Sequence, residues 1–118
     1  MQLFRFDPEV GSKIDRYESS GFIISGVAQV LKEAVVNCAH LSPGGGIGYH
    51  QAAAPQLFLV VQGEGWVRAE SGGRMPIRAG QAAFWGEGEW HESGTGPGMT
   101  AIIIESRDLD PANFMPLV

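Results

Sequence analysis

The chain has 118 residues, 44% hydrophobic and 18% charged, a composition typical of one globular domain and not of a disordered segment. Its net charge is −5 and its eight basic residues are scattered, which excludes the basic stripe that nucleic-acid binding requires. The 17 glycines argue against a long helical bundle, since each interior glycine costs a helix about 1 kcal/mol relative to alanine.

In the N-terminal third of the chain, apolar and β-branched residues favour strands over helices. Four strands are expected there: Gln2–Phe6, Ile14–Tyr17, Phe22–Leu31 and Ala34–Leu41. The dipeptides Asp7-Pro8 and Lys32-Glu33 mark turns between them. Cys38, the single cysteine, excludes an internal disulfide, and its apolar neighbours predict a buried, unreactive thiol.

The rest of the chain is punctuated by glycine, with 14 of the 17 glycines between Gly44 and Gly98. Most are expected in turns, where glycine supplies a positive φ. The expected strands are Gln56–Gln62, Trp66–Glu70, Arg74–Arg78, Ala82–Trp85 and Met99–Ser106. Gly63-Glu64-Gly65 is interpreted as a tight hairpin turn, and Ser93–Gly98 as a flexible turn. Short strands at regular spacing, bounded by turns, predict an antiparallel all-β barrel or sandwich.

One of these strands, Gln56–Gln62, is apolar on both faces. Leu57, Leu59 and Val61 alternate with the residues that share a face with Gln56. A strand of this kind needs cover on both sides. The second cover is expected from the N-terminal strands or from another subunit.

Two histidines stand at defined distances from the glycines. Five residues separate Gly44 from His50, Gln56 lies six positions beyond His50, and six residues separate Gln56 from Gly63. Because side chains alternate along a strand, residues an even number of positions apart share a face. His50 and Gln56 can therefore face the same side if the strand is continuous.

A second stretch shows a similar arrangement. Five residues separate Gly80 from Gly86, and two residues separate Gly88 from His91. Inward side chains from separate strands of a small barrel can converge on one point. The two stretches can therefore bring His50 and His91 together.

The spacing in both stretches resembles the two signature motifs of the cupin superfamily, without insertion or deletion in either. The resemblance implies an all-β, antiparallel double-stranded β-helix, or jelly-roll, cupin barrel. It also implies a single domain over residues 1–118, with a core barrel at about 34–106, N-terminal strands in 1–33 and a C-terminal tail in 107–118. Small cupins of this kind commonly pair as homodimers, so a homodimer is expected.

In the family, three histidines and a glutamate hold a divalent transition metal. This chain departs from the motifs at Ala52, Gln56, Gly86 and Thr95. Ala52 stands where the second histidine would be, and Gln56 where the glutamate would be, which weakens binding of a divalent cation. The candidate metal ligands are therefore His50, Gln56 and His91, for Fe, Mn, Ni, Co or Zn, with a metal-free site as the alternative.

The surroundings of the two histidines predict a small-molecule pocket. By alternation, Phe58 shares a face with Gln56, and Ser93 shares a face with His91. Small residues leave space, and apolar walls with a few polar groups are typical of such pockets. The expected pocket residues are His50, Ala52, Gln56, Phe58, His91 and Ser93. The histidine pair can also be interpreted as an interior structural pair bonded to Gln56.

Three functions remain open from the sequence. The first is a metal-dependent enzyme, such as a dioxygenase or isomerase, acting on a small polar molecule. The second is a metal-free ligand-binding or sensory protein, and the third is a structural protein whose barrel serves dimerisation. The longest apolar run, Leu57–Val61, is too short to span a membrane. We therefore expect a cytoplasmic protein with a small-molecule ligand and no membrane or nucleic-acid partner.

Overall fold

The computed structural model describes residues 1–118 and consists mostly of antiparallel strands. The strands are β1 (Gln2–Arg5), β2 (Ser12–Lys13), β3 (Ile23–Ile24), β4 (Val35–Leu41), β5 (Gly46–Gln51), β6 (Gln56–Ala69), β7 (Met75–Arg78), β8 (Gln81–Trp85), β9 (Trp90–Gly94) and β10 (Met99–Glu105). Three short 3-10 helices complete the fold: η1 (Pro8–Val10), η2 (Arg16–Glu18) and η3 (Pro111–Asn113). None of these helices has the length or apolarity needed to cross a membrane. The predicted all-β, antiparallel fold class is confirmed.

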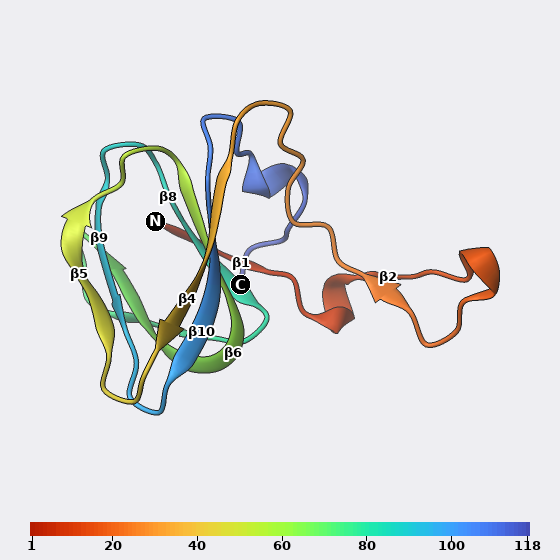
Figure 1. The fold of residues 1–118 in the computed structure, drawn as a ribbon, viewed down its shortest axis with the longest axis horizontal. Coiled ribbons are helices and arrows are strands. Elements are labelled where there is room, and N and C mark those ends of the chain that lie inside the picture. The colour runs from red at the N-terminus through yellow and green to blue at the C-terminus, as the bar shows by residue number, and fades with distance from the viewer.

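The long strand β6 joins the two halves of the fold. Its first part pairs with β8 and β10, in the strand order β1-β8-β6-β10-β4. Its second part pairs with β7 and β9, and β9 also pairs with β5. In Figure 1, β5 and β9 lie across the body of the fold from β4 and β10. The interior between these strands holds the main core.

The hairpin turn predicted at Gly63–Gly65 is wrong, because β6 runs through these residues without reversing. A Cβ on Gly63, which has a φ of +82°, would collide with the Gly98 carbonyl just before β10. A Cβ on Gly65 would collide with the Gly94 carbonyl of β9. These glycines therefore allow close approach of neighbouring backbone where β6 changes partners, and the chain after Gly65 continues the strand.

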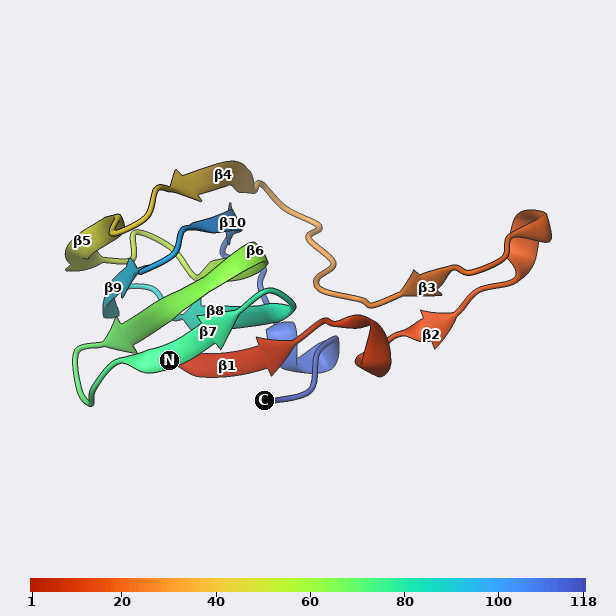
Figure 2. The same cartoon turned by 90° about the horizontal axis from the view of Figure 1, so that it is seen from below.

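Two strand predictions near the N-terminus are also wrong. Ile14–Tyr17 contains no strand, and within Phe22–Leu31 only β3 is a strand. β2 and β3 form a separate two-stranded sheet in residues 11–24, here called the arm, which projects away from the main body (Figures 1 and 2). Tyr17, near its tip, has a φ of 60°. β-branched residues form stable strands only where a partner strand and a packing surface exist, and most of the arm has neither.

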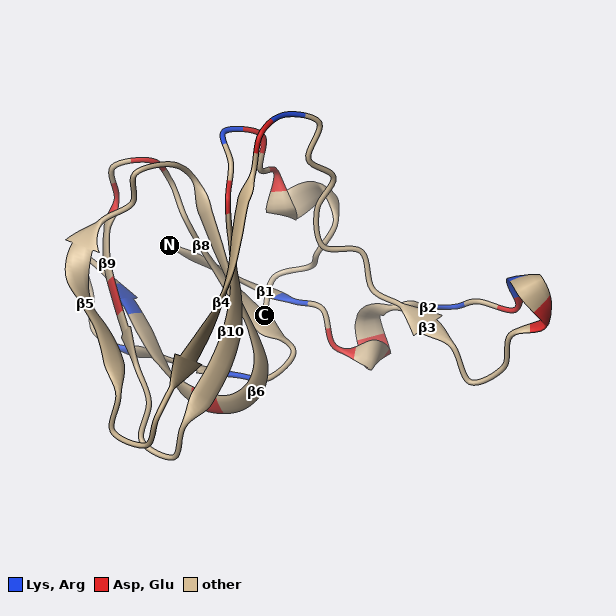
Figure 3. Cartoon of the chain, in the orientation of Figure 1, with Lys and Arg blue, Asp and Glu red and all other residues tan.

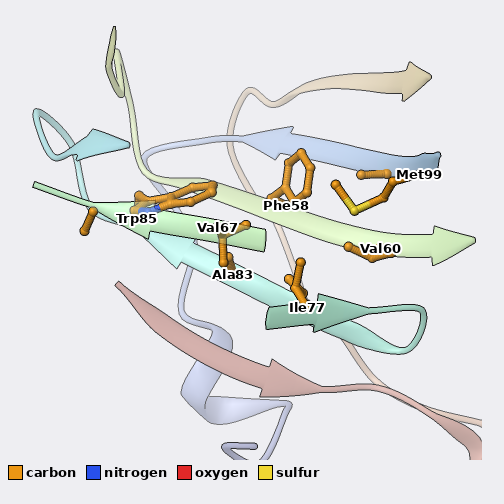
Figure 4. Packing of buried hydrophobic residues seen from close by; sticks show 9 residues of the cluster. Phe58, Val60, Val67, Ile77, Ala83, Trp85 and Met99 are labelled. Carbon is orange, nitrogen blue, oxygen red and sulfur yellow. The ribbon is translucent and has the colours of Figure 1, made fainter. Parts of the chain in front are cut away.

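The inner core fills the space between the strands, as Figure 4 shows. Its nine buried residues are Phe58, Val60, Val67, Ala69, Ile77, Ala83, Trp85, Met99 and Ala101. Both parts of β6 contribute to it, so the uninterrupted strand links the two halves through one cluster. Trp85 and Val60 have no exposed surface, and their burial supplies a large share of the hydrophobic stabilisation.

The opposite face of β6 is covered by the two ends of the chain itself. Leu57 and Leu59 pack in a second cluster with Phe4, Ala82 and Met115. The C-terminal tail is attached to β1, because the Arg5 N–H donates to the Pro116 carbonyl at 2.9 Å and Leu117 forms a bridge with Phe4. The predicted need for cover on both faces is thus met at Leu57 and Leu59 within one chain.

Strand β4 remains uncovered on its outer side. It pairs only with β10, and its Val35 and Val36 side chains are 58% and 60% exposed. Cys38 is exposed too, so the prediction of a buried thiol is wrong. Apolar neighbours in the sequence do not bury a residue whose strand lies at the edge of the fold with nothing packed over it.

Candidate small-molecule site

His50 and His91 lie side by side on the paired strands β5 and β9. They are direct partners in the register of this pair, and their ring centroids are 4.3 Å apart with an interplanar angle of 54°. Direct cross-strand neighbours have Cβ atoms about 4.5–5.5 Å apart, so the pairing alone brings the imidazoles together. β9 extends through Ser93 to Gly94, so the turn predicted to begin at Ser93 is wrong at its start.

Each imidazole is fixed by a hydrogen bond to the backbone two residues earlier. Nδ1 of His50 lies 2.6 Å from the Gly48 carbonyl, and Nδ1 of His91 lies 3.2 Å from the Glu89 carbonyl. A carbonyl only accepts, so Nδ1 donates its proton and the neutral ring keeps a lone pair on Nε2. Neither Nε2 forms a hydrogen bond within the protein. The site therefore presents two acceptor nitrogens.

The two rings border a cavity of about 140 Å³. Its lining residues come from six strands: Asn37, Ile47, His50, Gln56, Phe58, Trp85, His91, Ser93, Ile103 and Glu105. Trp85 stacks on His91 at 4.3 Å between ring centroids, and Phe58 meets Trp85 edge-on at 6.1 Å. Figure 4 shows where Phe58 and Trp85 lie in the core. Four of the ten lining residues are apolar and six are polar, so the cavity combines an apolar wall with several hydrogen-bonding groups.

Most of the residues predicted for the pocket line this cavity, including the three candidate metal ligands. Ala52 does not, although it is only 3% exposed. Its N–H donates to the Glu89 carbonyl at 3.0 Å, and its own carbonyl accepts from the Gly88 N–H at 2.8 Å. Ala52 therefore fixes the turn that precedes His91.

Sequence reasoning missed five cavity residues, of which Glu105 is the charged one: Asn37, Ile47, Trp85, Ile103 and Glu105. Glu105 ends the apolar strand β10 and is the direct register partner of Gln56. Alternation with Ile103, two residues earlier, was a usable signal that Glu105 faces inward. Only the pairing of β10 with β6 shows that it joins Gln56.

Burial in the cavity wall lowers the pKa of His91 below its ordinary value of 6.5. The neighbouring His50 imidazole lowers the pKa further, whereas the Glu89 backbone carbonyl and the carboxylates of Glu89 and Glu105 oppose the shift. The lowered pKa favours the neutral ring at pH 7. A neutral ring is the form that accepts a hydrogen bond at Nε2.

This shift predicts that the protein becomes less stable as the pH falls. Because the pKa of His91 is lower in the folded chain, the unfolded chain binds more protons below its pKa of about 6.5. The contribution of His91 to stability is complete above that value and is lost as the pH falls toward the folded pKa. Denaturant unfolding from about pH 7.5 to about pH 5.5 should show this decline in wild type. The decline should be smaller in His91→Gln and unchanged in His40→Gln, and an equal decline in all three would contradict the assignment.

A metal site of the family type does not fit the residues present. No group of three His, Cys, Asp or Glu side chains lies close enough to hold an ion. His50 and His91 offer two imidazole nitrogens, but Gln56 is a neutral amide and Ala52 offers no ligand at all. Two imidazoles and an amide oxygen make a weak set for a divalent transition metal, which is usually held by more imidazole, thiolate or carboxylate ligands.

Comparison with known proteins gives solved structures of similar fold. No protein-family model and no curated protein matches the chain. A predicted oxalate decarboxylase from Thermotoga maritima matches with a TM-score of 0.54 and 23% identity over 59% of this chain and 63% of its own. A cupin superfamily protein from Desulfitobacterium hafniense matches with a TM-score of 0.59 and 11% identity, over 78% of this chain and 82% of its own. The polyketide cyclase RemF from Streptomyces resistomycificus matches with a TM-score of 0.57 and 22% identity, over 66% of this chain and 57% of its own.

The match spans less than two thirds of the Thermotoga and Streptomyces proteins, so it concerns their common domain and not their whole length. Sequence identities at this level show a shared fold and do not show a shared activity. The antiparallel strand arrangement and these similarities together show that the chain has the fold of the cupin superfamily, as the spacing of its two motifs predicted.

Proposed function

We propose that this protein binds a small polar molecule in the cavity between His50 and His91, through both imidazoles and without a metal ion. The proposal is carried by the paired rings, whose Nδ1 atoms bond to backbone carbonyls while both Nε2 atoms remain free. Because backbone bonds hold the rings in place in the absence of a ligand, little further ordering opposes binding.

The cavity walls support the same function. Trp85 is fully buried, and its indole N–H is the only buried polar side-chain atom without a hydrogen-bond partner in the chain. An unpaired buried donor costs about 1–3 kcal/mol, and such a group calls for an explanation beyond packing. A bound molecule with an acceptor atom beside Trp85 would supply the missing partner.

Substitution of the two cavity histidines tests the proposal. We expect small alcohols, amides and amines to shift the NMR resonances of cavity residues in wild type. His50→Ala and His91→Ala should each weaken that binding at least about tenfold, because each removes one acceptor. His40→Ala is the matched control, since His40 is exposed on β4 and outside the cavity. Equal affinity in all four proteins, or no binding to wild type, would refute the proposal.

A weak divalent-metal site is the second candidate. It is favoured by one observation, the free Nε2 atoms of two direct cross-strand histidines. A ligand that binds only the folded state must raise its thermal stability. Melting wild type and His50→Ala with Zn²⁺ separates the candidates: a rise in wild type that is lost in the variant favours the metal, and no rise in either favours the metal-free site.

The expected homodimer is proposed to form through β4 and the arm. Tyr17, Ile23 and Ile24 of the arm are 88%, 42% and 45% exposed, and Val36 on the free edge strand is 60% exposed. A two-stranded hairpin is marginal alone, and an apolar sheet edge is a template for pairing with another chain. A second copy of the chain would present a strand edge to pair with β4 and an apolar surface to cover the arm.

Light scattering coupled to size-exclusion chromatography measures this association. We expect wild type to elute with the mass of a dimer, and the double variant Ile23→Ser, Ile24→Ser to dissociate at a concentration at least about tenfold higher. Met75→Ser serves as the control, because Met75 is 46% exposed on β7, away from the arm. A monomeric wild type would disprove the dimer, and equal weakening by Met75→Ser would disprove the proposed surface.

A further inference from the structure

We infer that the ligand of this cavity is a small cationic amine, an ammonium or amidinium compound of about four to six non-hydrogen atoms. The inference rests on the proposed function, because it names the chemical class that the same cavity binds. Three features carry it: an unpaired carboxylate in the lining, the absence of basic side chains there, and three groups that only accept hydrogen bonds.

The unpaired carboxylate belongs to Glu105, which lines the cavity beside its register partner Gln56. Glu105 is partly buried, and its side chain forms neither an ion pair nor a hydrogen bond. The ion pairs of the chain all use other carboxylates: Asp7, Glu9, Glu87, Glu89 and Glu92. Partial burial of a charge without a partner is unfavourable, and a cation in the cavity would offset that cost.

No lysine or arginine lines the cavity. Figure 3 shows the basic residues spread over the fold and not gathered around one site. Arg107, close to Glu105 in sequence, donates to Glu87 at 2.6 Å. Lys32 borders a separate surface groove, which Glu105 also borders, and forms no ion pair with it. An anionic ligand would therefore meet a carboxylate and no counter-charge.

Three polar groups of the cavity only accept hydrogen bonds. Nε2 of His50 and Nε2 of His91 each present a lone pair, and the Glu105 carboxylate accepts only. Asn37, Gln56 and Ser93 can both accept and donate, and the Trp85 indole N–H donates. An ammonium group carries three donors and no acceptor, so it can pair with the Glu105 carboxylate while the ligand also donates to an imidazole nitrogen. Phe58 and Trp85 add aromatic surface to the lining, with one face of Trp85 covered by the His91 ring.

The cavity volume limits the size of this ligand. A volume of about 140 Å³ corresponds to about five water molecules at the density of the liquid. Ethanolamine, ethylene glycol and glycolate are matched probes of suitable size, because they differ mainly in carrying an ammonium, a hydroxyl or a carboxylate. They can be titrated into the ¹⁵N-labelled full chain while the Trp85 indole and the two cavity imidazoles are observed.

We expect ethanolamine to bind about tenfold more tightly than ethylene glycol, with glycolate weaker still, because the ammonium pairs with Glu105. Glu105→Gln should abolish the preference for ethanolamine over ethylene glycol, because it removes the charge that pairs with the ammonium. Glu64→Gln is the control, since it removes the same charge from an exposed position outside the cavity.

The outcomes separate the two proposals. If ethylene glycol or glycolate binds as tightly as ethanolamine, or if Glu105→Gln keeps the preference, the amine class is wrong and small-molecule binding stands. If no probe binds to wild type, both are wrong. Should Glu105→Gln fail to fold, added salt replaces it in wild type: ethanolamine binding must weaken with salt more than ethylene glycol binding does, and equal salt dependence overturns the inference.

Discussion

Replacing Trp85 by alanine is expected to lower the free energy of unfolding by about 3–5 kcal/mol, the range for large-to-small changes in a packed core. Trp85 is fully buried in the inner core, stacks on His91 and meets Phe58 edge-on. Because a domain of this size is stable by only about 5–15 kcal/mol, the loss would be a large part of the total. Urea unfolding followed by far-UV circular dichroism measures it.

Trp90→Ala is the matched control for this prediction. Trp90 lies on β9 and stacks on Tyr49 at 5.1 Å, but it is only partly buried and belongs to neither core cluster. We expect Trp90→Ala to cost less than about half as much as Trp85→Ala, since less apolar surface is lost from the interior. Equal losses from both variants would show that Trp85 is not the central packing residue described above.

Gly65→Ala is expected to destabilise the fold by about 3 kcal/mol, although it adds only one methyl group to a strand. The added Cβ would collide with the Gly94 carbonyl and lie 3.2 Å from Sδ of Met99. Backbone cannot move aside as a flexible side chain can, so β6 and β9 must separate where His91 is positioned. Urea unfolding reports the loss, and the change in the His91 resonances reports the displacement.

Gly73→Ala provides the comparison for Gly65→Ala. Gly73 is exposed in the loop before β7, and no atom lies within 4 Å of a Cβ built there. We expect its substitution to change the free energy of unfolding by less than about 0.5 kcal/mol. If both alanine variants were equally stable, Gly65 would not be required for close strand approach, and the explanation given for the uninterrupted β6 would be wrong.

The proximity of His50 to His91 could be anticipated from sequence because their distances from glycines fix where each falls on its strand. The direct register of His50 with His91 could not be predicted, because it depends on which strands pair across the fold. Phe58 and Ser93 followed from the same alternation of side chains. The role of Ala52 could not be read, because its backbone hydrogen bonds depend on how the turn before His91 folds back.

The errors share a physical cause, since each concerns contact with a distant segment. Gly63 and Gly65 look like a turn unless the positions of β9 and β10 are known. The strand predicted at Phe22–Leu31 had suitable residues but no partner beyond Ile23–Ile24. Glu105 joins the site only because β10 pairs with β6. Local sequence determines strand propensity and which side chains share a face. Whether a segment forms a strand, a turn or part of the site depends on the segments that it contacts across the fold.

Crystallography of the full chain tests the central claim most directly. Crystals soaked with ethanolamine, ethylene glycol and Zn²⁺ together offer an organic ligand and a metal in the same experiment. We expect density for an organic molecule within hydrogen-bonding distance of Nε2 of both His50 and His91. A metal ion bound by both imidazoles and Gln56, or a cavity filled by the side chains of Phe58 and Trp85, would contradict it.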